Sequence, residues 1–259
     1  MNAKDRMNAE PTRGTIVFAS DLHLDHLVSD RIDCFERFLF ESLPRMGCDK
    51  LFLVGDIFNI WYRDPQLAQR YGDRILAMLN RYVAEVGPME YIVGNRDFAL
   101  CFVDLDCSFP IHLEGIWRML GDRKFFICHG DNLLKKDHGY HLLHGTIRQP
   151  FPMRVFHSLG TANKERIVNM LINLTHEVKR KKAFWKTEPF WPYLEDLVDE
   201  GMDVCIQGHK HDRTYRRLDG QKRIGRHFVL PRWFDHACGL KYNTASDRFH
   251  FFDLWETDD

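Results

Sequence analysis

The feature that most constrains this fold is a series of short apolar runs, each followed at once by a polar side chain suited to metal binding. Residues 15–18, 50–54 and 90–93 are rich in β-branched and aromatic residues, which is typical of buried strands. Residues 31–43 and 66–86 lie between them and show helical spacing of apolar residues. This alternation predicts a parallel sheet with helices on its faces.

The first three runs end close to Asp21, Asp56 and Asn95. In an open α/β sheet, ligands bind beyond the carboxyl ends of the strands. These side chains are therefore expected to lie close together at that edge of the sheet. His23 is two residues from Asp21, and a carboxylate and an imidazole at this spacing suit one divalent ion. A lone Asp-x-His pair is more often a capped turn. Side chains able to bind a metal also follow the other predicted strands, and this repetition favours a metal site.

Two later runs extend the pattern. Residues 124–128 lead to His129, and residues 203–207 lead to His209 and His211. The complete set of predicted ligands is Asp21, His23, Asp56, Asn95, His129, His209 and His211. This mixture of oxygen and nitrogen ligands without cysteine suits Mn, Fe, Zn or Mg. The set is too large for one ion and predicts two ions that share a bridging carboxylate, as phosphoryl-transfer chemistry requires.

Composition narrows the classes of partner. The formal net charge is −1, so no overall field favours nucleic acid, and a nuclease is disfavoured. The 7 cysteines form no C-x-x-C pair, which indicates reduced thiols in a cytoplasmic protein. Residues 1–14 are polar, are predicted to be flexible and contain no signal peptide. No stretch is long and apolar enough to span a bilayer.

Residues of about 133–197 differ in character from the rest. They combine helical spacing with many Lys and Arg side chains, and we predict a helical insertion over the active site within a single domain at 15–259. The strongest basic run, 179–182, includes Lys179 and Lys182. Such a run is most often a solvated helix face. The alternatives are contact with substrate phosphates or with anionic headgroups of the inner membrane, which predicts peripheral membrane association.

The motifs D-x-H, GD, GN, HGD and GHxH occur here in the order found in calcineurin-like metallophosphoesterases, and the chain resembles that family. The resemblance implies a four-layer α/β/β/α sandwich with two divalent ions. The sequences ASDLHL, GDIFNIW, GNRDF and LPRW are similar to the UDP-2,3-diacylglucosamine diphosphatases of lipid A biosynthesis. This closer likeness runs from about residue 15 to near residue 259.

The resemblance also implies roles for individual residues. The first ion takes Asp21, His23, Asp56 and His211, and the second takes Asp56, Asn95, His129 and His209. The ion preferred in that family is Mn²⁺. Arg96 contacts the substrate phosphates, and Asp137 and Tyr140 contact the nucleotide. The catalytic set is then Asp56, Asn95, Arg96 and His209, and Asn95 and His209 also contact substrate.

The implied reaction is hydrolysis of UDP-2,3-diacylglucosamine at the α-phosphorus, which yields UMP and 2,3-diacylglucosamine 1-phosphate. The chain departs from that family at Asn59, where an acid is usual, and at Lys210 within GHKH. It also departs at residues 62–64 and 175–182. These changes spare the predicted ligands but bear on the substrate. A soluble nucleotide, a sugar nucleotide or a phosphoprotein is therefore an alternative, as is a non-catalytic scaffold.

Overall fold

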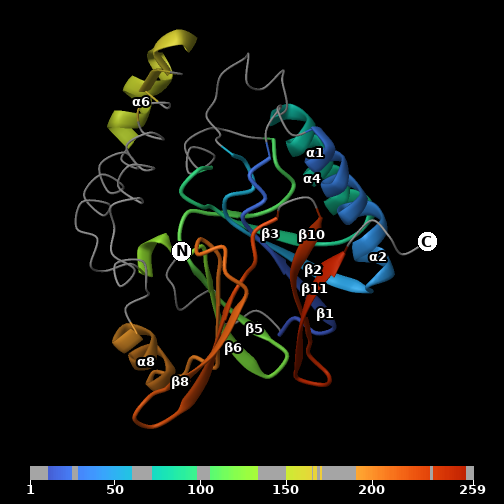
Figure 1. The fold of residues 1–259 in the computed structure, drawn as a ribbon, viewed down its shortest axis with the longest axis vertical. Coiled ribbons are helices and arrows are strands. Elements are labelled where there is room, and N and C mark those ends of the chain that lie inside the picture. The colour runs from blue at the N-terminus through green and yellow to red at the C-terminus, as the bar shows by residue number, and fades with distance from the viewer. Residues whose placement is uncertain are drawn as a thin grey trace.

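The computed structural model describes residues 11–24, 29–59, 72–97, 106–133, 150–164, 166–167, 170, 191–233 and 236–254. Two β-sheets pack face to face, and helices cover their outer faces (Figure 1). The predicted α/β/β/α architecture is confirmed. In the part of the chain that is described, no helix has both the length and the apolar character needed to span a membrane.

One sheet has six strands in the order β11-β10-β1-β2-β3-β4. Its parallel strands are β1 (Thr15–Ala19), β2 (Cys48–Val54), β3 (Met89–Ile92) and β4 (Ile111–His112). The antiparallel strands β10 (Ala237–Asn243) and β11 (Arg248–Leu254) complete it beside β1. The strands expected at 15–18, 50–54 and 90–93 are thus neighbours in one parallel sheet.

The other sheet has five strands in the order β5-β6-β7-β9-β8. Its parallel centre consists of β6 (Arg123–Cys128), β7 (Val204–Gln207) and β9 (Ile224–Val229). Its antiparallel edges are β5 (Ile116–Leu120) and β8 (Thr214–Asp219). A 3-10 turn, η5 (Asp131–Leu133), follows β6.

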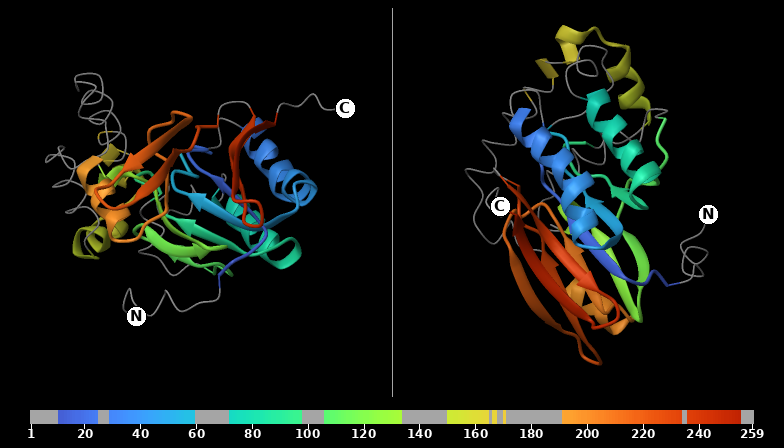
Figure 2. Two further views of the ribbon diagram at one scale, coloured as in Figure 1. Left: turned by 90° about the horizontal axis from the view of Figure 1, so that it is seen from below. Right: turned by 90° about the vertical axis from the view of Figure 1, so that its right-hand side faces the viewer.

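The helices lie outside the sheets. α1 (Ser29–Arg37), the π-helical turn η2 (Phe38–Ser42) and α2 (Leu43–Arg45) follow one another without a break. With α4 (Asp73–Glu85) they lie against the six-stranded sheet (Figure 2). α8 (Trp191–Asp199) lies against the other sheet. α6 (Pro150–Ser158) lies away from the strands in Figure 1, and its Phe156 packs against the core on the helical side of the six-stranded sheet.

Pro44, just after the predicted helix at 31–43, predicts that this helix ends there, but the helix continues to Arg45. Pro44 has no N–H to donate within the helix, and it directly follows the π-helical turn, in which the Leu43 N–H bonds to the carbonyl oxygen of Phe38. The regular hydrogen-bond ladder is thus already interrupted at this point. The chain turns at Gly47, whose φ is 65°. The second expected helix, 66–86, appears as α4 from Asp73 onward, and residues 66–71 lie outside the described part of the chain.

Alternate residues of the central strands face different cores. Val17 and Ala19 of β1 pack toward the helices, whereas Ile16 and Phe18 pack between the sheets. The Phe18 ring lies 5.3 Å from the Phe52 ring on its own sheet. Burial on both faces explains why these strands read as continuous apolar runs rather than as alternating patterns.

Two expectations about the late strands were wrong. The sequence of residues 226–230 and 248–254 predicts two late strands of one second sheet, but β9 belongs to the five-stranded sheet and β11 to the six-stranded one. β8 and β10 were not predicted as strands at all. β8 is exposed at every position except Leu218, and β10 carries Gly239 near its centre, so neither shows a clear strand pattern.

The end of the expected insertion also differs from expectation. α8 does not lie over the active site. It covers the outer face of the five-stranded sheet, where Leu194, Leu197 and Val198 pack with Cys205. α6 is the described helix of that segment that lies away from the sheets (Figure 1).

Candidate active site

The predicted ligands occupy the loops that follow the parallel strands, and several have strained backbones. Asp21 and His23 follow β1, and Asp56 follows β2, with φ values of 56°, 50° and 54°. His209 and His211 follow β7, with φ values of 67° and 61°. Left-handed backbone is unfavourable for residues with a Cβ and is concentrated at functional sites. Each turn bends its side chain back over the end of the sheet.

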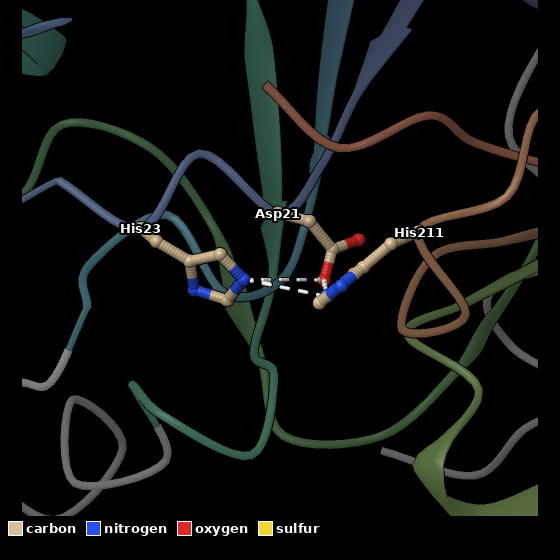
Figure 3. A group of neighbouring side chains, drawn as sticks. All are labelled: Asp21, His23 and His211. Atoms are coloured by element: carbon tan, nitrogen blue, oxygen red, sulfur yellow. Dashed lines mark hydrogen bonds and ion pairs between the residues drawn. The ribbon is translucent and has the colours of Figure 1, made fainter. Parts of the chain in front are cut away.

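The first group consists of Asp21, His23 and His211 (Figure 3). His211 Nε2 lies 3.0 Å from Asp21 Oδ1, and His23 Nε2 lies 3.9 Å from the same oxygen. The two Nε2 atoms are 3.3 Å apart. A carboxylate oxygen and two ring nitrogens thus converge on one point.

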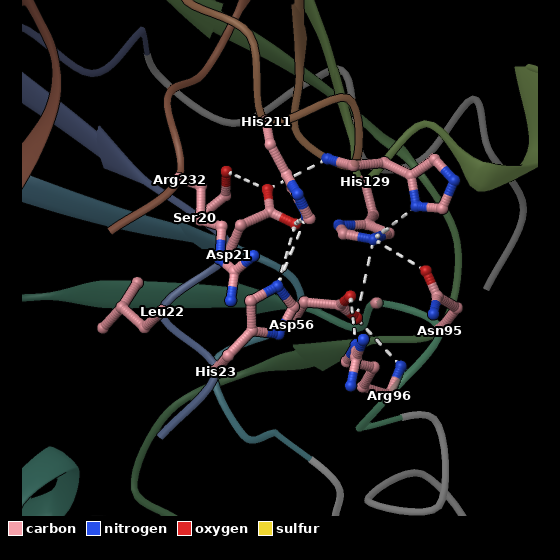
Figure 4. A network of polar contacts seen from close by, with 12 residues as sticks. Ser20, Asp21, Leu22, His23, Asp56, Asn95, Arg96, His129, His211 and Arg232 are labelled. Carbon is pink, nitrogen blue, oxygen red and sulfur yellow. Dashed lines mark hydrogen bonds and ion pairs between the residues drawn. The ribbon is translucent and has the colours of Figure 1, made fainter. Parts of the chain in front are cut away.

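The second group surrounds His129 (Figure 4). Its Nε2 lies 3.5 Å from Asp56 Oδ1, 3.2 Å from Asn95 Oδ1 and 3.3 Å from His209 Nδ1. On the far side of the ring, Nδ1 donates to the backbone oxygen of Val54 at 3.0 Å. This bond keeps a proton on Nδ1, so Nε2 is the nitrogen that can bind a cation once its own proton is displaced.

The two groups are joined through their carboxylates. Ligand atoms of Asp21, Asp56 and His129 all lie within 4.8 Å of one another. The other oxygen of Asp21 accepts hydrogen bonds from Ser20 Oγ at 2.7 Å and from the backbone N–H of His209 at 3.0 Å. The structure therefore brings all seven predicted ligands to one place, from loops of both sheets.

The charges of these groups are strongly coupled. Burial raises the pKa of Asp56 to about 6, with a further contribution from Asp97. Burial acts against the charged form of His129, but the carboxylates of Asp56 and Asp21 outweigh it and raise the pKa of His129 to about 9. Burial lowers the pKa of His23 to about 2. A cation that binds here must displace protons, so its affinity rises with pH.

Asp21 behaves differently from Asp56. Burial alone would raise its pKa, but the hydrogen bond with His211 and the charges of His129 and His23 hold the pKa well below its usual range. Asp21 is therefore a carboxylate at neutral pH. Its buried Oδ1 atom faces the Nε2 atoms of His211 and His23, at 3.0 Å and 3.9 Å. A buried carboxylate oxygen facing two ring nitrogens fits a divalent cation.

Arg96 lies beside the second group. Its backbone N–H donates to Asp56 Oδ1 at 2.8 Å, and its Nε lies 3.7 Å from Asp56 Oδ2. Its Nη1 donates to the side chain of Asn59 at 2.9 Å and to the Asn59 backbone oxygen at 3.2 Å. Asn59 therefore holds this guanidinium in place.

Sequence reasoning missed Asp97, which organises the loop after β3. Its buried carboxylate accepts hydrogen bonds from the backbone N–H groups of Gly94 at 2.6 Å and Ile57 at 3.0 Å, and from the Tyr91 hydroxyl. It thereby ties the Asn95 turn to the residue after Asp56. The Asp at the fourth position of GNRDF was the available signal.

Four predicted substrate contacts lie outside the described residues. These are Asp137, Tyr140, Lys179 and Lys182.

The calcineurin-like phosphoesterase family model matches residues 14–213. The chain is also similar to curated proteins. It is 28% identical over 246 residues to the UDP-2,3-diacylglucosamine hydrolase of Aliivibrio fischeri (strain MJ11), covering 91% of this chain and 98% of that protein. It is 26% identical over 256 residues to the protein of the same name from Blochmanniella pennsylvanica (strain BPEN), covering 93% and 98%.

Among solved structures, an archaeal phosphodiesterase is 16% identical with a TM-score of 0.47, covering 93% of this chain and 99% of that one. The matched family model spans most of the chain and includes every predicted ligand. Membership implies a dinuclear site for divalent metal ions, which the clustered side chains fit. The chain belongs to the calcineurin-like phosphoesterase family.

Proposed function

We propose that this chain hydrolyses UDP-2,3-diacylglucosamine to UMP and 2,3-diacylglucosamine 1-phosphate. The observation that carries the proposal is the convergence of acidic, amide and imidazole side chains from loops of both sheets. The relatives that carry this activity in their names align over nearly their whole length, which supports the same substrate class.

In this proposal Asp21, His23, Asp56 and His211 hold one ion, and Asp56, Asn95, His129 and His209 hold the other. Mn²⁺ is the proposed metal. Two divalent cations, when bound, supply Lewis-acid charge and activate water for attack on phosphorus. The Val54 bond to Nδ1 of His129 presents Nε2 as the ligand atom, and Ser20 orients Asp21.

Arg96 is the proposed contact for the substrate phosphates. The two hydrogen bonds from its Nη1 to Asn59 fix the plane of the guanidinium beside Asp56. A planar, permanently charged donor suits a phosphoryl group on which negative charge accumulates. Because a pyrophosphate releases a phosphate leaving group, no side chain has to donate a proton to it.

A diacylated substrate resides in a bilayer, so the proposal includes peripheral contact with the cytoplasmic face of the inner membrane. The described part of α6 supports this. Phe151 and Val155 are one helical turn apart and are 76% and 47% exposed. Apolar side chains in such positions favour an interfacial helix.

The test compares UDP-2,3-diacylglucosamine, UDP-glucose and bis(p-nitrophenyl) phosphate as substrates of the Mn²⁺-loaded protein. We expect the lipid substrate to have the highest kcat/KM. The Asp56→Asn variant should lose roughly 10³-fold in turnover because the carboxylate between the two groups is lost. Asp122→Asn is the matched control, since the Asp122 side chain is 87% exposed.

Equal kcat/KM values for UDP-glucose and the lipid would contradict the proposed substrate. Near-normal turnover and metal content in the Asp56→Asn protein would contradict the proposed role of Asp56.

A further inference from the structure

A further group of side chains able to bind a metal lies outside the candidate active site. It consists of His236, Cys238 and Asp253, and the ligand atoms of these three residues all lie within 4.8 Å of one another. The seven predicted ligands of the active site include no cysteine. The two places therefore differ in the kind of cation that they attract.

The strand pairing explains why these side chains meet. Cys238 of β10 and Asp253 of β11 are directly paired in the antiparallel register, and directly paired residues place their side chains on the same side of a sheet. His236 precedes Cys238 by two residues, just before β10 begins, and in extended chain this spacing also places side chains on one side. The grouping therefore follows from the register of the sheet.

The distances within the group suit a tetrahedral ion. His236 Nε2 lies 3.5 Å from Asp253 Oδ1, which is long for a hydrogen bond. Ligand atoms about 2.0–2.3 Å from a tetrahedral zinc ion lie roughly 3.3–3.6 Å from one another. Cys238 Sγ donates to the backbone oxygen of Arg232 at 3.4 Å, and a thiol is a weak donor whose bond a cation can replace.

Arg213 orients the Asp253 carboxylate from the other sheet. It directly precedes β8, and its Nη1 donates to Asp253 Oδ2 at 2.5 Å. Its guanidinium also lies 5.0 Å from the centre of the Phe251 ring. Because Arg213 bonds to Oδ2, the other oxygen, Oδ1, is the one that faces His236. The positive charge of Arg213 opposes a cation, and a thiol that becomes a thiolate on binding offsets this charge.

The exposure of the three side chains increases from the interior to the surface. Cys238 is 1% exposed, whereas the side chains of His236 and Asp253 are 13% and 32% exposed. Three protein ligands with one side toward solvent leave a fourth position for a water molecule. Thiolate and imidazole ligands favour zinc over Mg²⁺ and Mn²⁺, which prefer oxygen ligands.

We propose that His236, Cys238 and Asp253 form a zinc-binding site that is separate from the dinuclear site. On binding, the Cys238 thiol releases its proton to solvent and the sulfur binds as a thiolate. The ion links the start of β10 to the end of β11, where Arg213 bonds to Asp253. The competing interpretation is that Cys238 is only a small apolar side chain beside an ion pair of Asp253 with Arg213.

The test uses Co²⁺ as the probe, because Co²⁺ replaces zinc in such sites and a thiolate bound to it absorbs in the near ultraviolet. The full-length protein is titrated with Co²⁺ in excess Mn²⁺ and in the absence of oxygen. Co²⁺ at the dinuclear site gives no such band, since sulfur is missing from the predicted ligands there. Circular dichroism checks that each variant is folded.

We expect the wild type to develop this band with one Co²⁺ per chain, and added Zn²⁺ to remove it. Cys238→Ala should lose the band. His236→Gln and Asp253→Asn should each weaken Co²⁺ binding by at least about 10-fold, because even residues that only orient a metal ligand have effects of this size. Cys34→Ser and Cys107→Ser are the matched controls, because both cysteines are half-buried, and both variants should keep the wild-type band.

A wild type without the band would overturn the site, and so would a band that persists in Cys238→Ala. A band that is unchanged in both His236→Gln and Asp253→Asn would show binding through cysteine alone and would also overturn it. These two positions are partly exposed, so their variants decide the question if Cys238→Ala does not fold. No outcome depends on turnover of UDP-2,3-diacylglucosamine, so failure of the proposed substrate leaves this test intact.

Discussion

Backbone strain in the described residues is concentrated at the predicted ligands. Six non-glycine residues there have positive φ, and five of them are Asp21, His23, Asp56, His209 and His211. Each such residue costs roughly 1–3 kcal/mol. The surrounding structure must supply that energy, because these turns aim the side chains at one point.

Gly94 shows how little space the site leaves. A Cβ atom at this position would lie 2.2 Å from Asp56 Oδ1 and 2.4 Å from the backbone nitrogen of Asp56. Backbone cannot move aside cheaply, so only glycine permits the β3 loop to approach the β2 loop. Gly94 of the GN motif is thus required because the loops after β3 and β2 are in contact.

We expect Gly94→Ala to push Asp56 away from Asn95 and His129 and to reduce turnover by at least about 100-fold, since small displacements of catalytic groups have effects of this size. Bound metal should also fall below the wild-type ratio. The control is Gly160→Ala, because a Cβ at Gly160 meets nothing within 4 Å. A Gly94→Ala protein with wild-type metal content and turnover would contradict this account of the loop.

At the level of elements, Glu90 of β3 ties several strands together. Its carboxylate accepts from Lys50 Nζ on β2 at 2.8 Å, from His112 Nε2 on β4 at 2.8 Å and from Arg118 Nε on β5 at 2.9 Å. β5 belongs to the other sheet. A buried carboxylate with three such partners links the two sheets at the β4 and β5 edges.

We expect Glu90→Gln to lower the free energy of unfolding by about 3 kcal/mol at pH 7, because it leaves buried cations without their carboxylate. Burial would raise the pKa of Glu90, but the bonds from His112, Arg118 and Lys50 outweigh it and hold the pKa below its ordinary range. The stabilisation is therefore present above the unfolded-state pKa of about 4.3 and is lost as pH falls below it.

Urea unfolding of wild type and Glu90→Gln at pH 7 and at about pH 3.5, below the unfolded-state pKa, measures this effect. The difference between the two proteins should narrow at the lower pH. Glu85→Gln is the control, because the Glu85 side chain is 60% exposed. A difference that is constant with pH would show that Glu90 acts by packing and not by charge.

At the level of the whole molecule, the candidate site lies where the carboxyl ends of two sheets meet. Asp21, Asp56 and Asn95 come from the six-stranded sheet, whereas His129 and His209 come from the five-stranded one. Cations held there would join the sheets and stabilise the folded chain. The α6 ribbon lies away from the strands in Figure 1, and its Phe151 and Val155 side chains are exposed.

We expect the protein to float with vesicles of phosphatidylethanolamine and phosphatidylglycerol, and a Phe151→Glu/Val155→Glu double variant to lose most of this binding. Removing two exposed apolar side chains from a bilayer should weaken binding by at least about 10-fold. Ile224→Glu is the control, since Ile224 is 59% exposed on β9, away from α6. Equal flotation of the double variant and wild type would contradict contact through α6.

Local sequence determined much of this protein. The apolar runs that end at Asp21, Asp56 and Asn95 form neighbouring parallel strands, so the ligands at their carboxyl ends could be grouped from the sequence alone. This works because strand direction and side-chain chemistry are local properties, and parallel pairing brings like ends together. The motif order likewise matched the family whose model covers most of the chain.

Tertiary structure alone decided the rest. Arg232 forms a backbone β-bridge with Ser20, although the two residues lie far apart in the chain. Nothing near either residue in the sequence indicates that they come together. The assignment of β9 and β11 to different sheets depends on antiparallel pairing of β10 with both β1 and β11. Contacts of this kind depend on how loops and the edges of sheets pack in space, so they cannot be predicted from hydrophobic periodicity or motif spacing.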